Sequence, residues 1–259
     1  MPDLDAGGVT LLVVGAALAG AVNAVAGGGS LISFPTLLAV GYPALTANIT
    51  NTVALSPGYL GGTIGYRREL TGQRQRVVTL SAVSVSGAVA GSALLLVSSP
   101  ELFERIVPWL ILLGCALLSV QDRLAGLVRR RGGHIAPGDA WTRWAPLLAM
   151  QFVAAVYGAY FGAGLGIMML AILGIFISDS LQRLNALKGA MSLVINVVGA
   201  AYFAVFANVV WVAVAIMAAA SLVGGRIGVA MARRLNDRAL RWLVVVFGVG
   251  VAVRLMLPT

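Results

Sequence analysis

Two short polar stretches, one in each half of the chain, hold the side chains best suited to bind a ligand. The first is Asn48-Ile49-Thr50-Asn51-Thr52, and the second, 137 positions later, is Asn185-Ala186-Leu187-Lys188. Each stretch opens an apolar run that has the length of a helix. The start of a helix carries free N–H groups and partial positive charge, and Lys188 adds a full positive charge. These residue types therefore favour the binding of an anion.

A glycine-rich stretch precedes each polar stretch. The two are Gly27-Gly28-Gly29-Ser30 and Gly162-Ala163-Gly164-Leu165-Gly166. Glycine weakens a helix and permits backbone angles that other residues avoid, so we expect a broken helix at each stretch. The first stretch offers backbone N–H groups to a ligand. In the second, Gly158, Gly162 and Gly166 recur at every fourth residue, which favours close helix packing instead.

The candidate substrate-binding residues therefore come from the two polar stretches and from the first glycine stretch. They are Gly28, Gly29, Ser30, Asn48, Asn51, Thr52, Asn185 and Lys188. A structural alternative stays open for the side chains among them. Asn and Thr are common helix caps, and a lysine near the end of an apolar helix extends toward the polar surface.

Residues suited to catalysis or to metal binding are sparse. The single histidine, His134, lies in a polar segment, and the nine acidic residues lie in expected loops or near the ends of apolar runs. Neither a metal-ligand cluster nor a catalytic triad can be assembled from them. We therefore expect no enzymatic activity and no bound metal or cofactor.

The composition indicates a membrane protein. Hydrophobic residues make up 59% of the 259 residues, charged residues only 10%, and the mean hydropathy is +0.95. A soluble domain has roughly 25% charged residues. The net charge of +9 would suit nucleic acid, but the arginines cluster in short segments between apolar runs, as in the cytoplasmic loops of membrane proteins. We therefore expect no nucleic-acid partner.

The apolar runs follow one another in the same order in both halves of the chain. Several reach the roughly 20 residues that cross a bilayer, whereas the runs 31–40 and 165–177, which follow the glycine stretches, are shorter. We expect two transmembrane repeats, 1–120 and 143–259, joined by a cytoplasmic loop at 121–142.

The arginine clusters predict the topology. The positive-inside rule places 67–76, 121–142 and 233–241 inside the cell, so that both termini lie outside and the second repeat is inverted relative to the first. The expected fold class is an all-α integral membrane protein with two inverted repeats of transmembrane helices, each with a glycine-broken helix hairpin. Inverted repeats with broken helices are typical of transporters, whose substrates bind near the bilayer midplane.

The first glycine stretch and its surroundings also resemble a known family. The segment from Gly27 to Pro35, then Gly41-Tyr42-Pro43 and the polar residues 47–52, is similar to the first repeat of the TauE/SafE sulfite exporter family. In the second half, 162–166, 185–188 and 208–211 extend the similarity. The resemblance covers nearly the whole chain.

The second repeat departs from the family pattern at two positions. Leu165 and Ala171 stand where a glycine and a proline are usual, so its break is expected to be less pronounced. The resemblance implies a transporter of sulfite, sulfoacetate or related sulfur-containing anions.

We therefore expect a multi-pass protein of the cell membrane that exports, or facilitates the passage of, a small anion such as sulfite or an organosulfonate. The alternative is a non-transporting membrane scaffold or assembly subunit, which has no need for broken helices at depth. The expected partners are the small anion and the lipid bilayer, and the sequence leaves a homo-oligomer open.

Overall fold

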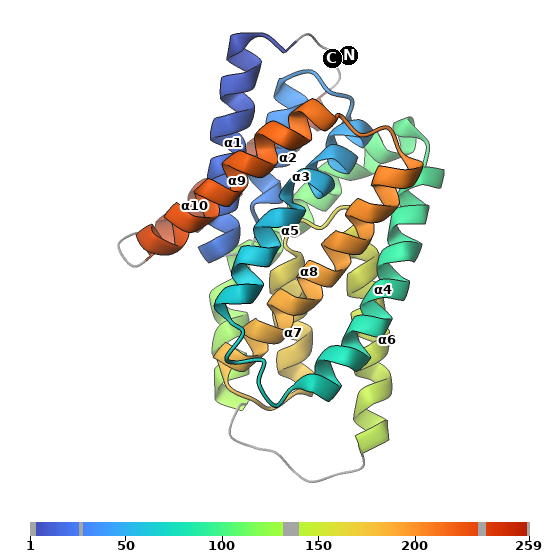
Figure 1. Cartoon of the computed structure of the whole chain (residues 1–259), viewed down its shortest axis with the longest axis vertical. Helices are drawn as coiled ribbons and strands as arrows, with labels where there is room; N and C mark the ends of the chain where they lie inside the picture. Colours follow the sequence, from blue (N-terminus) through green and yellow to red (C-terminus); the bar gives the residue numbers. More distant parts are fainter. Residues whose placement is uncertain (1–3, 26–27, 132–139, 233–236, 258–259) are drawn as a thin grey trace.

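The chain folds into a bundle of α-helices (Figure 1). The computed structural model describes residues 4–25, 28–131, 140–232 and 237–257, and within them the only regular elements are ten helices. The helices are α1 Ala6–Val25, α2 Ser30–Ala39, α3 Ala44–Gly65, α4 Arg74–Val97, α5 Pro100–Arg131, α6 Ala140–Tyr160, α7 Leu165–Phe176, α8 Leu181–Phe206, α9 Trp211–Ala232 and α10 Asp237–Met256. The prediction of an all-helical protein is confirmed.

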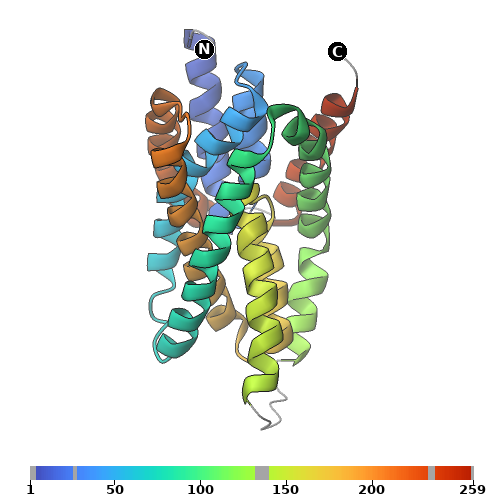
Figure 2. The same ribbon diagram turned by 90° about the vertical axis from the view of Figure 1, so that its right-hand side faces the viewer.

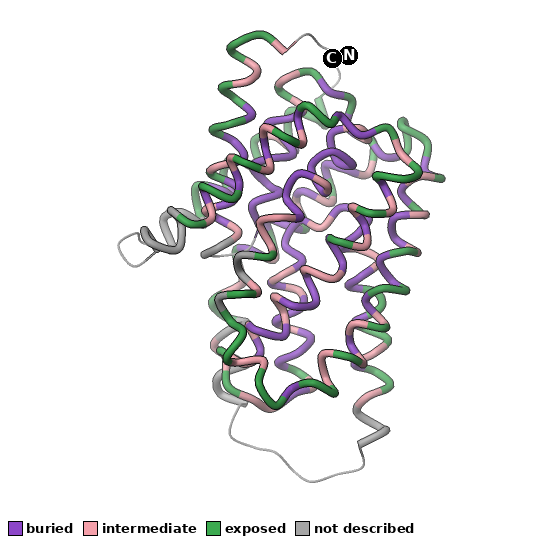
Figure 3. Tube along the Cα trace, viewed as in Figure 1, coloured by how far each residue is buried: buried purple, intermediate pink, exposed green. Residues whose placement is uncertain are grey.

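Several of these helices have the length and apolar character of membrane spans. Among the described residues, four segments qualify on both counts: Ala6–Asn23, Arg74–Val97, Pro100–Arg123 and Leu181–Phe206. Large apolar side chains point outward from the bundle, and Val97 is 79% exposed. The burial pattern in Figure 3 places buried residues toward the centre and exposed ones on the outer faces of the helices. A broad apolar outer surface is what a bilayer covers.

The helix ends differ from the prediction in one place. The sequence predicts a loop from 121 to 142, but α5 continues to Arg131 and α6 begins at Ala140. The extension is rich in Leu, Arg, Gln and Ala, which are good helix formers outside a membrane as well. His134 and the rest of 132–139 lie outside the described residues.

Both glycine stretches interrupt helices. The chain leaves α1 at Val25 and enters α2 at Ser30, and it leaves α6 at Tyr160 and enters α7 at Leu165. The backbone has φ +126° at Gly28, and φ +76° and +73° at Gly162 and Gly164. Side chains rarely tolerate these angles, so glycine is required at the three positions.

Two helix pairs pack at very short range. α1 lies along α9, and α4 lies along α6. A Cβ atom added at Gly224 would collide with the backbone of Ala17, and one added at Gly87 would collide with Ala155. Gly87 and Gly224 are 137 positions apart. Small residues let helix backbones approach closely inside a membrane, where packing stabilises their association.

The central helices α3 and α8 run antiparallel. The Ser56 hydroxyl donates a hydrogen bond to the backbone carbonyl of Asn196 (3.1 Å). On one side of this contact Thr52 lies beside Gly199, and on the other side Thr63 lies beside Gly189. Residue numbers therefore rise along α3 as they fall along the facing part of α8.

The two ends of the bundle are distinct. The start of α1 and the end of α10 lie at one end, whereas α5 ends and α6 begins at the opposite end (Figures 1 and 2). The turn between α3 and α4 also lies at this second end. The break between α6 and α7 is held inside the bundle by aromatic packing, because Phe161 meets Phe34 of α2 edge to face with ring centres 5.4 Å apart.

Candidate functional site

The lysine of the second polar stretch lies at the start of the broken helix α7. A Cβ atom built on Gly166 would lie 3.6 Å from Cδ and 3.9 Å from Cε of Lys188, so the lysine stem crosses the first turn of α7. The amino-terminal end of a helix is partially positive. A full positive charge and a helix N-terminus thus meet at one place in the second half of the chain.

Lys188 is half-buried, and it forms no ion pair with a carboxylate among the residues that the structure describes. The ion pairs of Asp179 with Arg76 and Arg183 do not include Lys188. A charged group inside a membrane segment is costly unless it meets a partner or serves a function. The ammonium group is therefore suited to receive a mobile anion.

Asn48 and Asn51 form the corresponding stretch in α3, and both are buried. The Asn48 amide nitrogen donates to the backbone carbonyl of Tyr160 (2.8 Å), the last residue of α6. The side-chain oxygens of Asn48 and Asn51 have no hydrogen-bond partner among the described residues. A buried polar atom without a partner costs about 1–3 kcal/mol, so these oxygens are candidates for contact with a passing ligand.

Thr52 and Ser92 both lie against Gly199. The Thr52 hydroxyl is satisfied by the backbone carbonyl of Asn48 (3.1 Å), and its methyl group faces Gly199. Ser92, from α4, is fully buried, and its hydroxyl has no partner in the part of the chain that the structure describes. The sequence analysis did not select Ser92, because a serine in an apolar helix is too common to stand out.

The backbone N–H groups of the first glycine stretch bind a side chain of the protein, whereas the sequence led us to expect that they bind a ligand. The N–H groups of Gly28 and Gly29 donate to the side-chain oxygen of Asn23 (3.1 and 2.8 Å). Ser30 is buried and begins α2. The side chain of Asn23, near the end of α1, therefore binds the backbone directly before α2. This role depends on how the chain turns between the two helices, and we did not predict it from the sequence.

The candidate residues do not converge on one point. Thr52 lies beside Gly199 of α8, and Lys188 precedes Gly199 by eleven residues, which is about 16 Å along the helix axis. The structure thus separates an asparagine group, which comprises Asn48, Asn51 and Thr52, from a lysine group, which comprises Asn185 and Lys188. Asn185 lies one helical turn before Lys188 on the same face of α8.

A third polar cluster lies between the two groups. The Tyr59 hydroxyl lies near the side chains of Asn23 and Asn196. Ser56, one turn away on α3, binds the backbone of Asn196. We call Ser56, Tyr59 and Asn196 the central cluster. The sequence analysis selected none of them as substrate-binding, because their partners come from distant parts of the chain.

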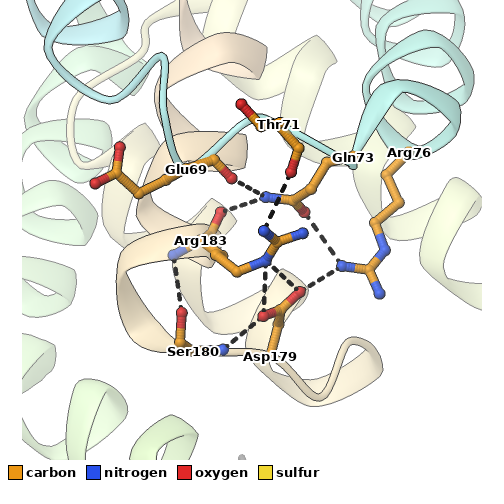
Figure 4. A network of polar contacts seen from close by, with 7 residues as sticks. All are labelled: Glu69, Thr71, Gln73, Arg76, Asp179, Ser180 and Arg183. Atoms are coloured by element: carbon orange, nitrogen blue, oxygen red, sulfur yellow. Dashed lines mark hydrogen bonds and ion pairs between the residues drawn. The ribbon is translucent and has the colours of Figure 1, made fainter.

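An ionic network closes the end of the bundle at which α3 and α4 meet (Figure 4). Asp179 pairs with Arg76 of α4 (2.6 Å) and with Arg183 of α8 (3.0 Å), and it accepts a hydrogen bond from the N–H of Ser180 (2.8 Å). Burial acts to raise the pKa of the Asp179 carboxyl, but the hydrogen bonds from Arg76 and Ser180 and the charge of Arg183 outweigh it, so the pKa lies below its usual range. Asp179 is ionised near neutral pH.

Metal binding has no support in the described residues, which contain no group of three or more His, Cys, Asp or Glu side chains able to hold an ion. What the side chains offer instead is a cation, helix N-termini and neutral amides along two central helices.

Apolar outer helices, helices interrupted at glycines and a line of polar groups at the centre define a polytopic membrane protein of the transporter class. The chain belongs to the sulfite exporter TauE/SafE family, whose model matches residues 12–255. It is accordingly an integral membrane protein and a membrane transporter of that family, as the resemblance of its two glycine stretches implied.

Relatives that carry the same kind of name span nearly the same length. A probable membrane transporter protein, ORF9 of Sinorhizobium sp, is 22% identical over 256 residues, 99% of this chain and 95% of its own length. A probable membrane transporter protein of Haemophilus influenzae is 25% identical and covers 87% of this chain and 85% of itself. The probable membrane transporter protein YfcA of Escherichia coli is 23% identical, with coverages of 93% and 87%. No solved structure gives a significant match.

Proposed function

We propose that the protein exports a small oxyanion, sulfite or an organosulfonate, across the cell membrane along the interface of α3 and α8. The observation that carries this proposal is Lys188, an ammonium group without a carboxylate partner among the described residues, which lies against the first turn of α7. Such a pairing of charge and helix N-terminus favours an anion over a cation or a neutral solute.

Two inverted repeats, 1–120 and 143–259, would account for the way the helices pair. Each helix can be matched with the helix five places later in the chain, counting on from α10 to α1. This match turns the α1–α9 pair into the α6–α4 pair, and the α3–α9 pair into the α8–α4 pair. The same match exchanges α3 with α8, which run antiparallel. Gly87 and Gly224 support this match between the repeats, since Gly87 allows α4 to approach α6 closely and Gly224 allows α9 to approach α1 closely.

The inverted repeats set the proposed topology. The segments 67–76 and 121–142 lie inside the cell, both termini lie outside, and α1–α2 and α6–α7 are hairpins that enter the membrane and return to the same side. The common location of the α3–α4 turn and the α5–α6 junction at one end of the bundle supports this arrangement (Figure 2). Of the third basic segment, 233–241, the residues 233–236 lie outside the described part of the chain.

The polar groups suggest an order of events. An anion from the cytoplasm meets the charge of Lys188 first, then the neutral central cluster, and then the asparagine group at the outer half of α3. Attraction declines along this route, which eases release on the far side. The membrane potential adds about 2.3 kcal/mol per charge for each 100 mV, and it drives an anion outward from a negative interior.

Flux measurements on proteoliposomes test the proposal. We expect flux of at least one of sulfite, sulfoacetate, thiosulfate, sulfate and taurine, driven by a concentration gradient or by voltage. Lys188→Met should lower the flux by roughly tenfold or more, since a hydrogen bond to a charged group is worth about 1.5–3 kcal/mol, while Lys188→Arg should retain part of it. Arg74→Met, which removes an exposed arginine, is the matched control.

Two outcomes would count against this function. If none of the five solutes moves under any gradient, a non-transporting scaffold becomes the better interpretation. If one of them moves and Lys188→Met transports it as fast as the parent protein, the substrate path lies away from α7 and α8.

A further inference from the structure

The Asp179 network holds more positive than negative charge. One carboxylate faces two guanidinium groups and the N–H of Ser180, which immediately precedes α8. Gln73 contributes only neutral groups, as its side-chain oxygen accepts from Arg76 (3.2 Å). Glu69 takes part through its backbone carbonyl, and its side chain points away from Asp179 in Figure 4. The network therefore has room for more negative charge than Asp179 supplies.

The two arginine side chains are more exposed to water than the aspartate side chain. The side chains of Arg76 and Arg183 are 33% and 34% exposed, and that of Asp179 is 17% exposed. Guanidinium groups bind carboxylates and small oxyanions through the same pattern of parallel N–H donors. A tetrahedral oxyanion from solution would therefore find suitable donors at the place that Asp179 now occupies.

The position of the network relates it to Lys188. Arg183 precedes Lys188 by five residues on α8, a rise of about 7.5 Å. Arg183 also donates from its side chain to the backbone carbonyl of Thr71 (3.2 Å), which fastens the α3–α4 turn to α8. Arg183 therefore lies more than one helical turn nearer to this end of the bundle than Lys188.

We infer that Arg76, Arg183 and the Ser180 N–H form an entry site for a small oxyanion, which the Asp179 carboxylate occupies as an internal substitute until a solute anion displaces it. Displacement removes the direct ionic link between α4 of the first repeat and the α7–α8 turn of the second. Gln73 still joins the two repeats, since its amide nitrogen donates to the backbone carbonyls of Glu69 and Arg183. The choice of an oxyanion as ligand rests on the proposed transport function.

Sulfate binding to the full chain tests the inference in a Lys188→Met background, which removes the positive charge of the proposed transport path. The measurement is calorimetric titration of the protein in detergent. Removing the internal competitor with Asp179→Ala should tighten sulfate binding by about tenfold or more, because the site is then open in every molecule. Asp179→Asn, which keeps the side-chain volume, should give a smaller gain.

Two further variants locate the binding. Arg76→Gln added to Asp179→Ala should abolish the gain, whereas Arg74→Gln, which removes an exposed arginine two positions away, should leave it intact. Thermal unfolding with and without sulfate shows that each variant is folded and provides a second readout, since a bound ligand raises Tm.

The inference is overturned if folded Asp179→Ala and Asp179→Asn proteins bind sulfate no more tightly than the parent, or if the gain survives the loss of Arg76. Neither outcome depends on flux. A protein that transports none of the five solutes but gains Arg76-dependent sulfate binding would refute the transport proposal and support the entry site.

Discussion

Asn48 of α3 donates a hydrogen bond from its side-chain amide to the backbone carbonyl of Tyr160 at the end of α6, 2.8 Å away. The bond joins residues 112 positions apart and satisfies a carbonyl that the end of α6 leaves free. Through it, the polar stretch of the first half supports the break between α6 and α7 in the second half.

Loss of this bond should destabilise the protein. Asn48→Ala leaves the Tyr160 carbonyl without its donor, which should lower the free energy of unfolding by about 1 kcal/mol. Asn185→Ala is the matched control, because Asn185 occupies the corresponding position in α8 and has no side-chain hydrogen bond among those described. Thermal unfolding in detergent should give a lower Tm for Asn48→Ala than for Asn185→Ala. Equal Tm values would show that the bond adds nothing to stability.

The two glycine stretches should respond differently to alanine. A Cβ at Gly29 would collide with the backbone carbonyl of Ala19, so Gly29→Ala should cost about 1–3 kcal/mol as overpacking. A Cβ at Gly166, 137 positions later, would meet Lys188 at an ordinary contact distance of 3.6 Å, so Gly166→Ala should keep nearly the parent stability. Yield and Tm of the two purified variants provide the comparison, and a Gly166→Ala protein as unstable as Gly29→Ala would contradict it.

Gly166→Leu tests the neighbouring lysine. The larger side chain has to displace the stem of Lys188 from the first turn of α7, so anion flux should fall while Tm changes less than in Gly29→Ala. Normal flux in this variant would show that transport does not need Lys188 at that place.

The Asp179 network should make stability depend on pH in the acid range. The pKa of Asp179 is lower in the folded protein than its ordinary value of about 3.9, so the ionised carboxylate stabilises the fold above that pH. This stability is lost as the pH falls through the lowered folded-state pKa. Asp179→Asn should therefore have a lower Tm than the parent protein at pH 7, and the two values should converge as the pH falls through the lowered pKa of Asp179. A Tm difference that is constant over this range would mean that the charge of Asp179 contributes no stability.

Cysteine labelling should establish the orientation of the bundle. In a Cys115→Ala background, Arg68→Cys in the α3–α4 turn should react with a membrane-impermeant reagent only after the cells are opened. Glu101→Cys, at the first turn of α5, should react in intact cells; both residues are exposed in the structure. A cysteine in 233–241 that is labelled from outside intact cells would refute the inverted-repeat topology.

Much of the architecture depends on local features and was therefore predictable from the sequence. Whether a segment enters a bilayer depends on its own length and apolar content, so the helices followed from composition. The break before Leu165 followed from glycines that adopt φ values of +76° and +73°. The family followed from the glycine stretches and the polar stretches that come after them, a pattern that recurs in both halves, with Asn48 and Asn185 137 positions apart.

Only the tertiary structure decided how the candidate residues are grouped. From the sequence we expected the N–H groups of Gly28 and Gly29 to be available to a ligand, whereas both of them donate to the side chain of Asn23. We also expected Asn51 and Lys188 in one site, yet the antiparallel packing of α3 and α8 separates their groups by about 16 Å along α8. A polar stretch specifies its own helix start, but packing rather than local spacing decides which residues face it, as when Asn48 binds Tyr160, 112 positions away, and Thr52 faces Gly199 of α8.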